Sequence, residues 1–202
     1  MARSKGASVD VGNSYRRNSR VGATPNPVMP LPDDVDRRFA EAADDVLAGS
    51  TELLRRTVPS HQAAIALIVA GDWTSARKYF SLPERYAAWA DYAVPAFGTG
   101  VHEWLRGQRG VVRWTQAQLE AHPAFRGFSG QTGHPPMRGW LATTIRDRDD
   151  VVWGIVQLSD RADGGEYEDY DAETLGMFAG SLSLTLGALW DLHAARRREA
   201  GA

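Results

Sequence analysis

Cysteine is absent from this 202-residue chain. The absence excludes disulfides, thiolate metal sites, thiol catalysis and chromophores attached through a cysteine. Long apolar runs are also missing, because no segment reaches the roughly 18 unbroken apolar residues of a membrane span. The sequence therefore predicts a cytoplasmic protein that does not enter a membrane.

Basic residues are scarce outside the N-terminal segment. Residues 1–32 hold five basic residues against Asp10 alone, a formal charge of +4, whereas 18 basic and 24 acidic residues leave the rest at −6. Nucleic acids are bound by clustered Lys and Arg, so the acidic part argues against them as partners. Segment 1–32 lacks apolar periodicity and predicts a disordered basic tail, followed by one domain over 33–198 and a short tail over 199–202.

Catalytic and metal-binding motifs are missing as well. The chain has no Gly-rich phosphate loop after a strand, no serine in a nucleophile elbow and no histidine pair at metal-ligand spacing. The acidic run Asp147-Arg-Asp-Asp150 lacks the glycine and the distant glutamate of a calcium loop, so we interpret it as a turn. These observations predict that the protein is not an enzyme and holds no metal ion.

Two apolar arms around that turn carry the clearest structural signal. They run from Met137 to Arg146 and from Val151 to Asp160, and both are rich in β-branched and aromatic residues. This pattern predicts an antiparallel hairpin. Because both arms are largely apolar, we expect both faces to be covered, by helices on one side and by a candidate ligand pocket on the other.

Apolar spacing predicts the elements before the hairpin. A first helix follows Asp34 and closes at Pro59, and its apolar seam is interrupted at Gly49-Ser50. After it, the pattern predicts strands over 63–70 and 75–82, a short helix that carries Tyr86, Trp89 and Tyr92, a helix over 101–106, an edge strand over 111–113, and a helix over 116–122 that Thr115 caps in a capping box with Gln118. The Gly- and Pro-rich segment 124–136 is a candidate lid.

A long helix is predicted at the C-terminal end. Its start is acidic, and its apolar stripe comprises Leu175, Phe178, Leu182, Leu186, Leu189 and His193. The small residues Gly176, Ala179, Gly180 and Gly187 lower helix propensity but allow another backbone to approach closely. We therefore expect this helix to pack tightly against a sheet or a second subunit.

Candidate ligand-binding residues lie around the start of the first hairpin arm. Arg138 can hold a carboxylate or phosphate by two hydrogen bonds, and Trp140 can stack on a planar ligand. The full candidate set is Arg138, Trp140, His134, Trp89, Tyr92 and Trp104. The structural alternative is that Arg138 pairs with an acidic residue while Trp140 and the other aromatics fill the core.

Three segments together resemble the GAF modules of bacterial PAS/GAF sensor histidine kinases. They are Trp114-Thr-Gln-Ala-Gln-Leu-Glu-Ala-His-Pro-Ala-Phe125, His134-Pro-Pro-Met-Arg-Gly-Trp-Leu-Ala142 and Gly154-Ile-Val-Gln-Leu-Ser-Asp160. The resemblance covers about residues 35–195. It implies an α/β (α+β) fold with a central antiparallel sheet, N- and C-terminal helices on one face, and helices and loops over a pocket on the other.

The resemblance also implies a function. GAF domains are small-molecule sensors that often dimerise through their terminal helices, which here are residues 35–57 and 172–195. We therefore expect a stand-alone sensor that binds a small molecule without a covalent bond and signals in trans to a partner protein as a homodimer. The alternative is a dimerisation or adaptor module without a ligand.

Specific GAF chemistries narrow this expectation. Cyclic-nucleotide-binding members carry Asn-Lys, then Phe, then Asp-Glu in this part of the chain. The positions that resemble them here are Asp160, Arg161, Tyr167, Asp171 and Ala172, so one residue of the motif is kept. The resemblance implies an Arg161–Asp171 salt bridge but argues against cyclic nucleotides. Bilin-binding members and GAF-type methionine sulfoxide reductases need cysteine and are excluded. The cofactor stays unknown. A haem ligand would come from His102, His122 or His134.

Overall fold

The computed structural model describes residues 34–69, 72–89, 100–125 and 138–201. In chain order its elements are α2 (Asp34–Thr57), β1 (Ser60–Val69), β2 (Asp72–Ser81), the 3₁₀ helix η2 (Glu84–Trp89), α3 (Gly100–Arg106), β3 (Val112–Trp114), α4 (Gln116–Ala121), β4 (Trp140–Arg146), β5 (Val152–Arg161) and α5 (Asp169–Ala200). The predicted tail over 1–32 and most of the predicted lid over 124–136 lie outside the described residues.

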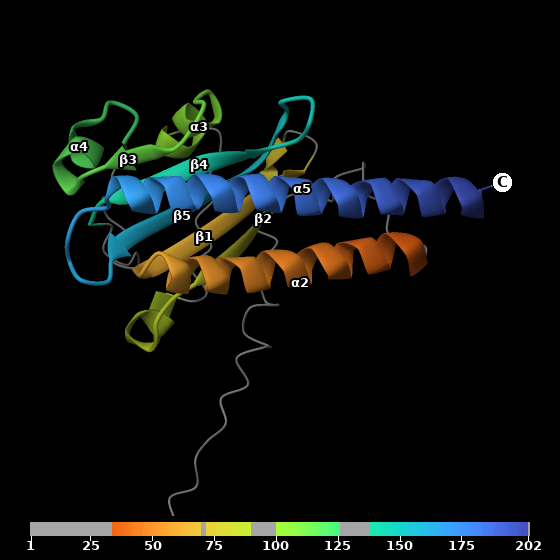
Figure 1. Cartoon of the computed structure of the whole chain (residues 1–202), viewed down its shortest axis with the longest axis horizontal. Coiled ribbons are helices and arrows are strands. Elements are labelled where there is room, and N and C mark those ends of the chain that lie inside the picture. Colours follow the sequence, from red (N-terminus) through yellow and green to blue (C-terminus); the bar gives the residue numbers. More distant parts are fainter. Residues whose placement is uncertain (1–33, 70–71, 90–99, 126–137, 202) are drawn as a thin grey trace, which may run out of the picture.

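Five strands form one antiparallel sheet in the order β2-β1-β5-β4-β3 (Figure 1). β4 and β5 form the predicted hairpin, in which Trp140 lies opposite Ser159. The polar break is a turn, as predicted, because the carboxylate of Asp147 accepts the backbone N–H groups of Asp149 and Val151. β5 pairs with β1 on its other side, so the second arm of the hairpin is the central strand.

Helices α2 and α5 lie side by side and antiparallel, and they cover one face of the sheet (Figure 1). The predicted apolar stripe of α5 is confirmed, since Leu175, Leu182 and Leu186 are buried against the sheet and α2. Its first turn has a capping box formed by Glu168 and Asp171. The helix continues to Ala200, two residues past the predicted domain boundary.

The predicted first helix is confirmed, and it runs through the glycine and serine that interrupt its apolar seam. α2 is continuous through Gly49 and Ser50. Leu47 and Leu54 are fully buried on either side of the glycine. Burial of each leucine contributes about 1.5–3 kcal/mol, which outweighs the cost of about 1 kcal/mol for one helical glycine.

Strand boundaries also differ from the prediction. β1 begins at Ser60 rather than Ala63 because its first residues pair with β5, with Ser60 opposite Arg161. β2 begins at Asp72 rather than Ser75 because Asp72 pairs with Val69 across the turn. Pairing with neighbouring strands, rather than apolar content, sets these ends.

The other face of the sheet, called the second face below, carries α3 and α4. Val101 and Leu105 of α3 and Leu119 of α4 are buried against it. The predicted capping box is confirmed: Thr115 accepts the N–H of Gln118, whose side chain accepts the N–H of Thr115. The two helical layers and the sheet give the expected α/β (α+β) architecture.

Candidate functional site

Strand alternation selects the side chains of the second face. Tyr79, Ile65, Val156 and Leu141 belong to the core beneath α2 and α5, so their neighbours in each strand face the other way. The second face therefore carries Lys78 and Phe80 from β2, Gln62, Ala64 and Ala66 from β1, Ile155 and Gln157 from β5, and Trp140, Ala142 and Thr144 from β4.

A hydrogen-bonded polar group lies in the middle of this apolar face. Oε1 of Gln157 lies 2.9 Å from Nε1 of Trp140 and 2.8 Å from Nε2 of His102. Trp140 comes from β4, Gln157 from the central strand and His102 from α3. The three side chains therefore tie the hairpin to the helix that covers it.

The indole fixes the orientation of the whole group. An indole N–H can only donate, so the atom of Gln157 that faces Trp140 is its carbonyl oxygen. The same oxygen faces His102, which must then donate from Nε2. The NH₂ end of Gln157 consequently points away from both partners.

Lys78 is a second polar group on this face. Its side chain is half-buried, and burial lowers the pKa of its ammonium to about 8. Ala66 separates it from Ile155 on the central strand. A cation held in a partly dry setting costs stability, and such groups are enriched at functional sites.

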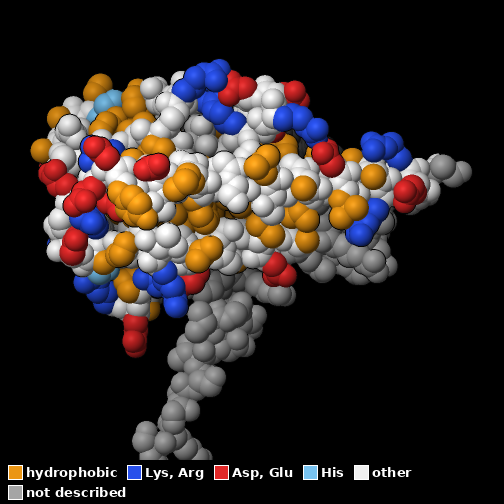
Figure 2. Space-filling model, in the orientation of Figure 1, with side chains coloured by type: hydrophobic (Ala, Val, Ile, Leu, Met, Phe, Trp, Pro, Cys, Tyr) orange, Lys and Arg blue, Asp and Glu red, His pale blue; other side chains and the backbone are white. Residues whose placement is uncertain are grey.

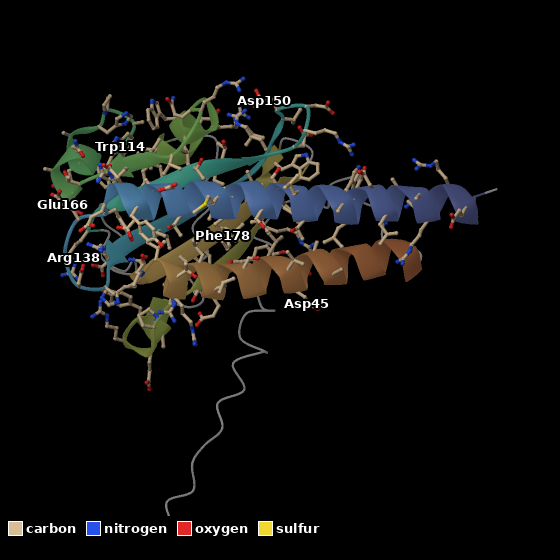
Figure 3. The ribbon with its side chains drawn as sticks, viewed as in Figure 1. Asp45, Trp114, Arg138, Asp150, Glu166 and Phe178 are labelled. Carbon is tan, nitrogen blue, oxygen red and sulfur yellow. The ribbon has the colours of Figure 1, made fainter. Side chains whose placement is uncertain are left out.

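Arg138, a predicted ligand-binding residue, lies at the end of the sheet opposite the hairpin turn marked by Asp150 (Figure 3). It donates from Nε and Nη2 to the carboxylate of Asp160, at 2.8 and 3.2 Å. Asp160 is fully buried and also accepts from the hydroxyl of Tyr86 at 2.7 Å, with Arg85 3.6 Å away. These contacts give Arg138 the structural partner that the sequence left open, while its role toward a ligand stays a prediction.

Burial perturbs the groups around this carboxylate. The pKa of the Tyr86 hydroxyl is raised by burial and by its hydrogen bond to Asp160. The pKa of His61, whose ring lies edge-on to Tyr86, is lowered by burial and by the charge of Arg85. The group is thus a paired structural charge centre at the end of β5.

The implied Arg161–Asp171 pair is present, with Nε of Arg161 3.4 Å from Oδ2 of Asp171. Beside it, the Tyr167 hydroxyl lies 3.0 Å from Oγ of Ser60. Burial raises the pKa of that tyrosine above its usual range. These contacts join the segment before α5 to β1 and β5.

The predicted aromatic residues are not all brought together. Trp140 is fully buried, and Trp104 packs on Trp114 with ring centroids 4.8 Å apart. Trp114 links the two, because its ring centroid lies 5.3 Å from that of Trp140. His134, Tyr92 and the side chain of Trp89 lie outside the described part of the chain.

Two of the three histidines considered as haem ligands, His102 and His122, have other partners. His102 contacts Gln157, and His122 stacks on Trp114 at 4.4 Å while its Nδ1 accepts the N–H of Ala124. Among the described residues, no group of three His, Cys, Asp or Glu side chains could hold a metal ion.

Sequence reasoning missed Gln157 and Lys78. Gln157 could have been found from the sequence, because side chains alternate along a strand and Gln157 therefore lies on the same face as Ile155 and Trp140. For Lys78 the amino-acid pattern carried no comparable signal.

The outward surface of α5 is the second candidate site. Residues 174–190 contain no charged side chain, and Met177 and Leu184 are 62% and 78% exposed. Figure 2 shows hydrophobic side chains along the outward surface of this helical layer. A Cβ added to Gly180 or Gly187 would meet nothing within 4 Å, so both glycines leave notches at the surface. The expected close packing at these two glycines is therefore not made by the described residues.

The composition of α5 also suits a membrane span. It is the one helix in the described ranges long and apolar enough, and 22% of its apolar window is buried. Its buried stripe packs on the sheet, however, and length with composition alone is weak evidence for a span.

A shallow groove of about 310 Å³ lies beside α5. Its lining combines small residues of the helix with the segment before β3 and with β4: Arg109, Gly110, Val111, Thr143, Thr144, Arg146, Gly176, Ala179, Gly180 and Ser183. Its two arginines pair with Asp150, and the hydroxyl of Thr143 donates to Gly110. The groove thus presents satisfied polar groups.

Comparisons by sequence are negative: no protein-family profile and no curated protein matches this chain. Solved structures do match. A GAF domain/HD domain protein from Geobacter sulfurreducens superposes with a TM-score of 0.58 at 15% identity, over 78% of this chain and 99% of that one. A far-red cyanobacteriochrome photoreceptor gives 0.57 at 12% identity, over 77% and 93%.

An enzyme is also among the matches. The free methionine-R-sulfoxide reductase of Neisseria meningitidis, solved with its substrate, gives a TM-score of 0.52 at 19% identity, over 77% of this chain and 84% of that one. The fold therefore serves both sensor modules and enzymes. The resemblance drawn from three short segments is confirmed in three dimensions, and the chain has the fold of a GAF domain.

Proposed function

We propose that this chain is a regulatory GAF-type domain that works as a homodimer through residues 35–57 and 172–195 and binds a small molecule non-covalently on its second face. It passes the signal in trans to a partner protein. The observation that carries this proposal is the exposed, uncharged surface of α5 over residues 174–190. A soluble domain rarely leaves such a surface to water, and such patches mark interaction sites.

A second copy fits this surface because the helix is complementary to itself. Met177 and Leu184 project, whereas Gly180 and Gly187 leave notches at the same seven-residue spacing. Side chains of one helix can therefore enter the notches of its twin, as in other tightly packed helix pairs. Leu53 of α2 is also exposed and extends the apolar surface onto the neighbouring helix.

The central strand offers the route between ligand and dimer. Gln157 faces the second face, while its neighbours Val156 and Leu158 are buried beneath α2 and α5. A ligand that moves β5 would change the packing of both terminal helices. The coupling then follows the same strand rather than a distant pathway.

Light-scattering mass after gel filtration tests the dimer. We expect twice the 22.1 kDa chain mass for the wild type and the single mass for Leu184→Lys. Val151→Lys is the matched control, because Val151 is exposed and belongs to the hairpin turn rather than to α5. A monomeric wild-type protein at tens of micromolar would contradict the proposal.

The ligand is tested on the purified dimer. Native mass spectrometry finds a retained small molecule, and hydrogen exchange is compared before and after its removal. We expect changed protection in residues 35–57 and 172–195, and unchanged protection there would rule out the coupling.

The alternative is an adaptor module that dimerises without a ligand, which the same α5 surface also supports. A dimer that retains no small molecule and whose second face binds no added probe would favour it. We further propose that the chain is not an enzyme and acts in the cytoplasm; the missing cysteine supports the first point, since the thiol chemistry expected of GAF-type sulfoxide reductases is unavailable.

A further inference from the structure

The amide of Gln157 has two hydrogen-bond donors to offer. Trp140 and His102 both donate to its oxygen, so the NH₂ group is directed away from them. Within the described ranges no acceptor bonds this NH₂ group. Nε2 of Gln157 is not among the enclosed polar atoms without a partner in the described ranges, so water can reach it, and a ligand oxygen can replace that water.

Small and apolar side chains surround this donor. Ala64 lies between Gln157 and Phe80, and Ala66 lies between Ile155 and Lys78 in the sheet register. Ala64 and Phe80 are half-buried and form an apolar floor beside the amide, whereas Ala66 and Ile155 are buried in the core beneath α3. Such a floor suits the apolar body of a small ligand.

Lys78 stands diagonally across β1 from Gln157. Neighbouring strands are about 4.8 Å apart, so their Cα atoms are roughly 12 Å apart, near enough for both side chains to contact one ligand. A carboxylate fits these two partners better than a neutral carbonyl, because it accepts several hydrogen bonds and offsets the charge of the ammonium.

We propose that the ligand of the second face is a small carboxylic acid with an apolar body, whose carboxylate accepts from the Gln157 amide and lies toward the Lys78 ammonium. The inference rests on the proposed small-molecule role and names its ligand class. His102 and Trp140 act as positioning residues, because they hold the amide with its donors toward the ligand.

NMR of the full-length, ¹⁵N-labelled protein tests the proposal. The side-chain NH₂ signals of Gln157 are assigned by their loss in Gln157→Glu and followed during titration with benzoate, 3-methylbutanoate and cyclohexanecarboxylate. Benzyl alcohol is the uncharged comparison probe. We expect saturable shifts of these signals with at least one carboxylate and not with the alcohol.

Two variants locate the contacts. Gln157→Glu keeps an oxygen for Trp140 and His102 but replaces the donors by a negative oxygen, so we expect carboxylate affinity to fall about ten-fold or more. Lys78→Met should weaken it comparably. Arg56→Met, which removes an exposed cation from α2 on the opposite side of the sheet, should leave it unchanged.

The outcomes separate this inference from the proposed function. Equal shifts with carboxylates and benzyl alcohol would overturn the carboxylate class while leaving small-molecule binding intact. The absence of a shift with every carboxylate would also overturn the carboxylate class. In that case native mass spectrometry and hydrogen exchange in the terminal helices would test the sensor role independently. Unchanged affinity in both Gln157→Glu and Lys78→Met would refute the assigned contacts.

Discussion

The indole N–H of Trp140 donates to Oε1 of Gln157 across the β4–β5 hairpin, at 2.9 Å. Trp140 is fully buried, so its polar atom needs a partner inside the protein. The bond therefore stabilises the hairpin and at the same time orients the only amide that the central strand places on the second face in residues 152–161.

Loss of that acceptor should destabilise the fold. Gln157→Leu leaves a buried indole N–H without an acceptor, and we expect the free energy of unfolding to fall by about 1–3 kcal/mol. Gln157→Glu retains an oxygen and should lose much less. Urea denaturation of both variants checks this, and equal losses would show that the bond to Trp140 is not the cause.

The charge pair at the end of β5 gives a compensation experiment. Arg138→Met removes the bidentate partner of a buried carboxylate, so we expect a lower melting temperature. Asp160→Asn in the same chain removes the buried charge and should recover most of the loss. If the double variant melts below Arg138→Met, the carboxylate has a stabilising role that does not need the arginine.

Lys78 should cost stability at neutral pH. Its folded pKa of about 8 lies below the ordinary value of 10.5, so the unfolded chain binds more protons between these values. Stability should therefore rise as pH increases from 8 to 10.5. Lys78→Met should stabilise the protein by about 1–2 kcal/mol at pH 7, after allowance for the exposed part of the side chain, and by little at pH 10.5.

Denaturation at pH 7 and pH 10.5 checks the lysine prediction, with Arg56→Met as the control for loss of an exposed cation. A gain that is the same at both pH values would show that the methionine acts by packing rather than by removing a charge.

The notches of α5 distinguish folding from association. Gly180→Ala and Gly187→Ala add a methyl group that meets nothing in the chain, so each should stabilise the protomer by about 0.5–1 kcal/mol. If a second helix enters the notches, the same changes should weaken the dimer. If no second helix enters the notches, the dimerisation constant measured by analytical ultracentrifugation should not change.

Gly154 is required for a different reason. A Cβ at this position would lie 2.4 Å from the carbonyl oxygen of Ala66 on the paired strand. Since neither backbone can move without breaking the sheet, Gly154→Ala should cost about 3 kcal/mol or more. Chemical denaturation checks this, with Gly180→Ala as the control, and a cost below about 1 kcal/mol would contradict it.

The sequence by itself determined the secondary structure of the described part to a large extent. The two apolar arms and the acidic turn specify the hairpin, Thr115 and Gln118 specify the start of α4, and the period of α5 specifies its buried stripe. Each of these signals is local, because turn chemistry, capping and amphipathic period act over a few residues.

Tertiary structure decided the rest. It buried Leu47 and Leu54 on either side of Gly49, and this burial outweighs the low helix propensity of glycine. It also gave Arg138 its partner Asp160 and set Lys78 and Gln157 on one face. These relationships depend on strand order and on contacts between residues far apart in the chain, and no local pattern encodes which distant strand will lie beside a given side chain.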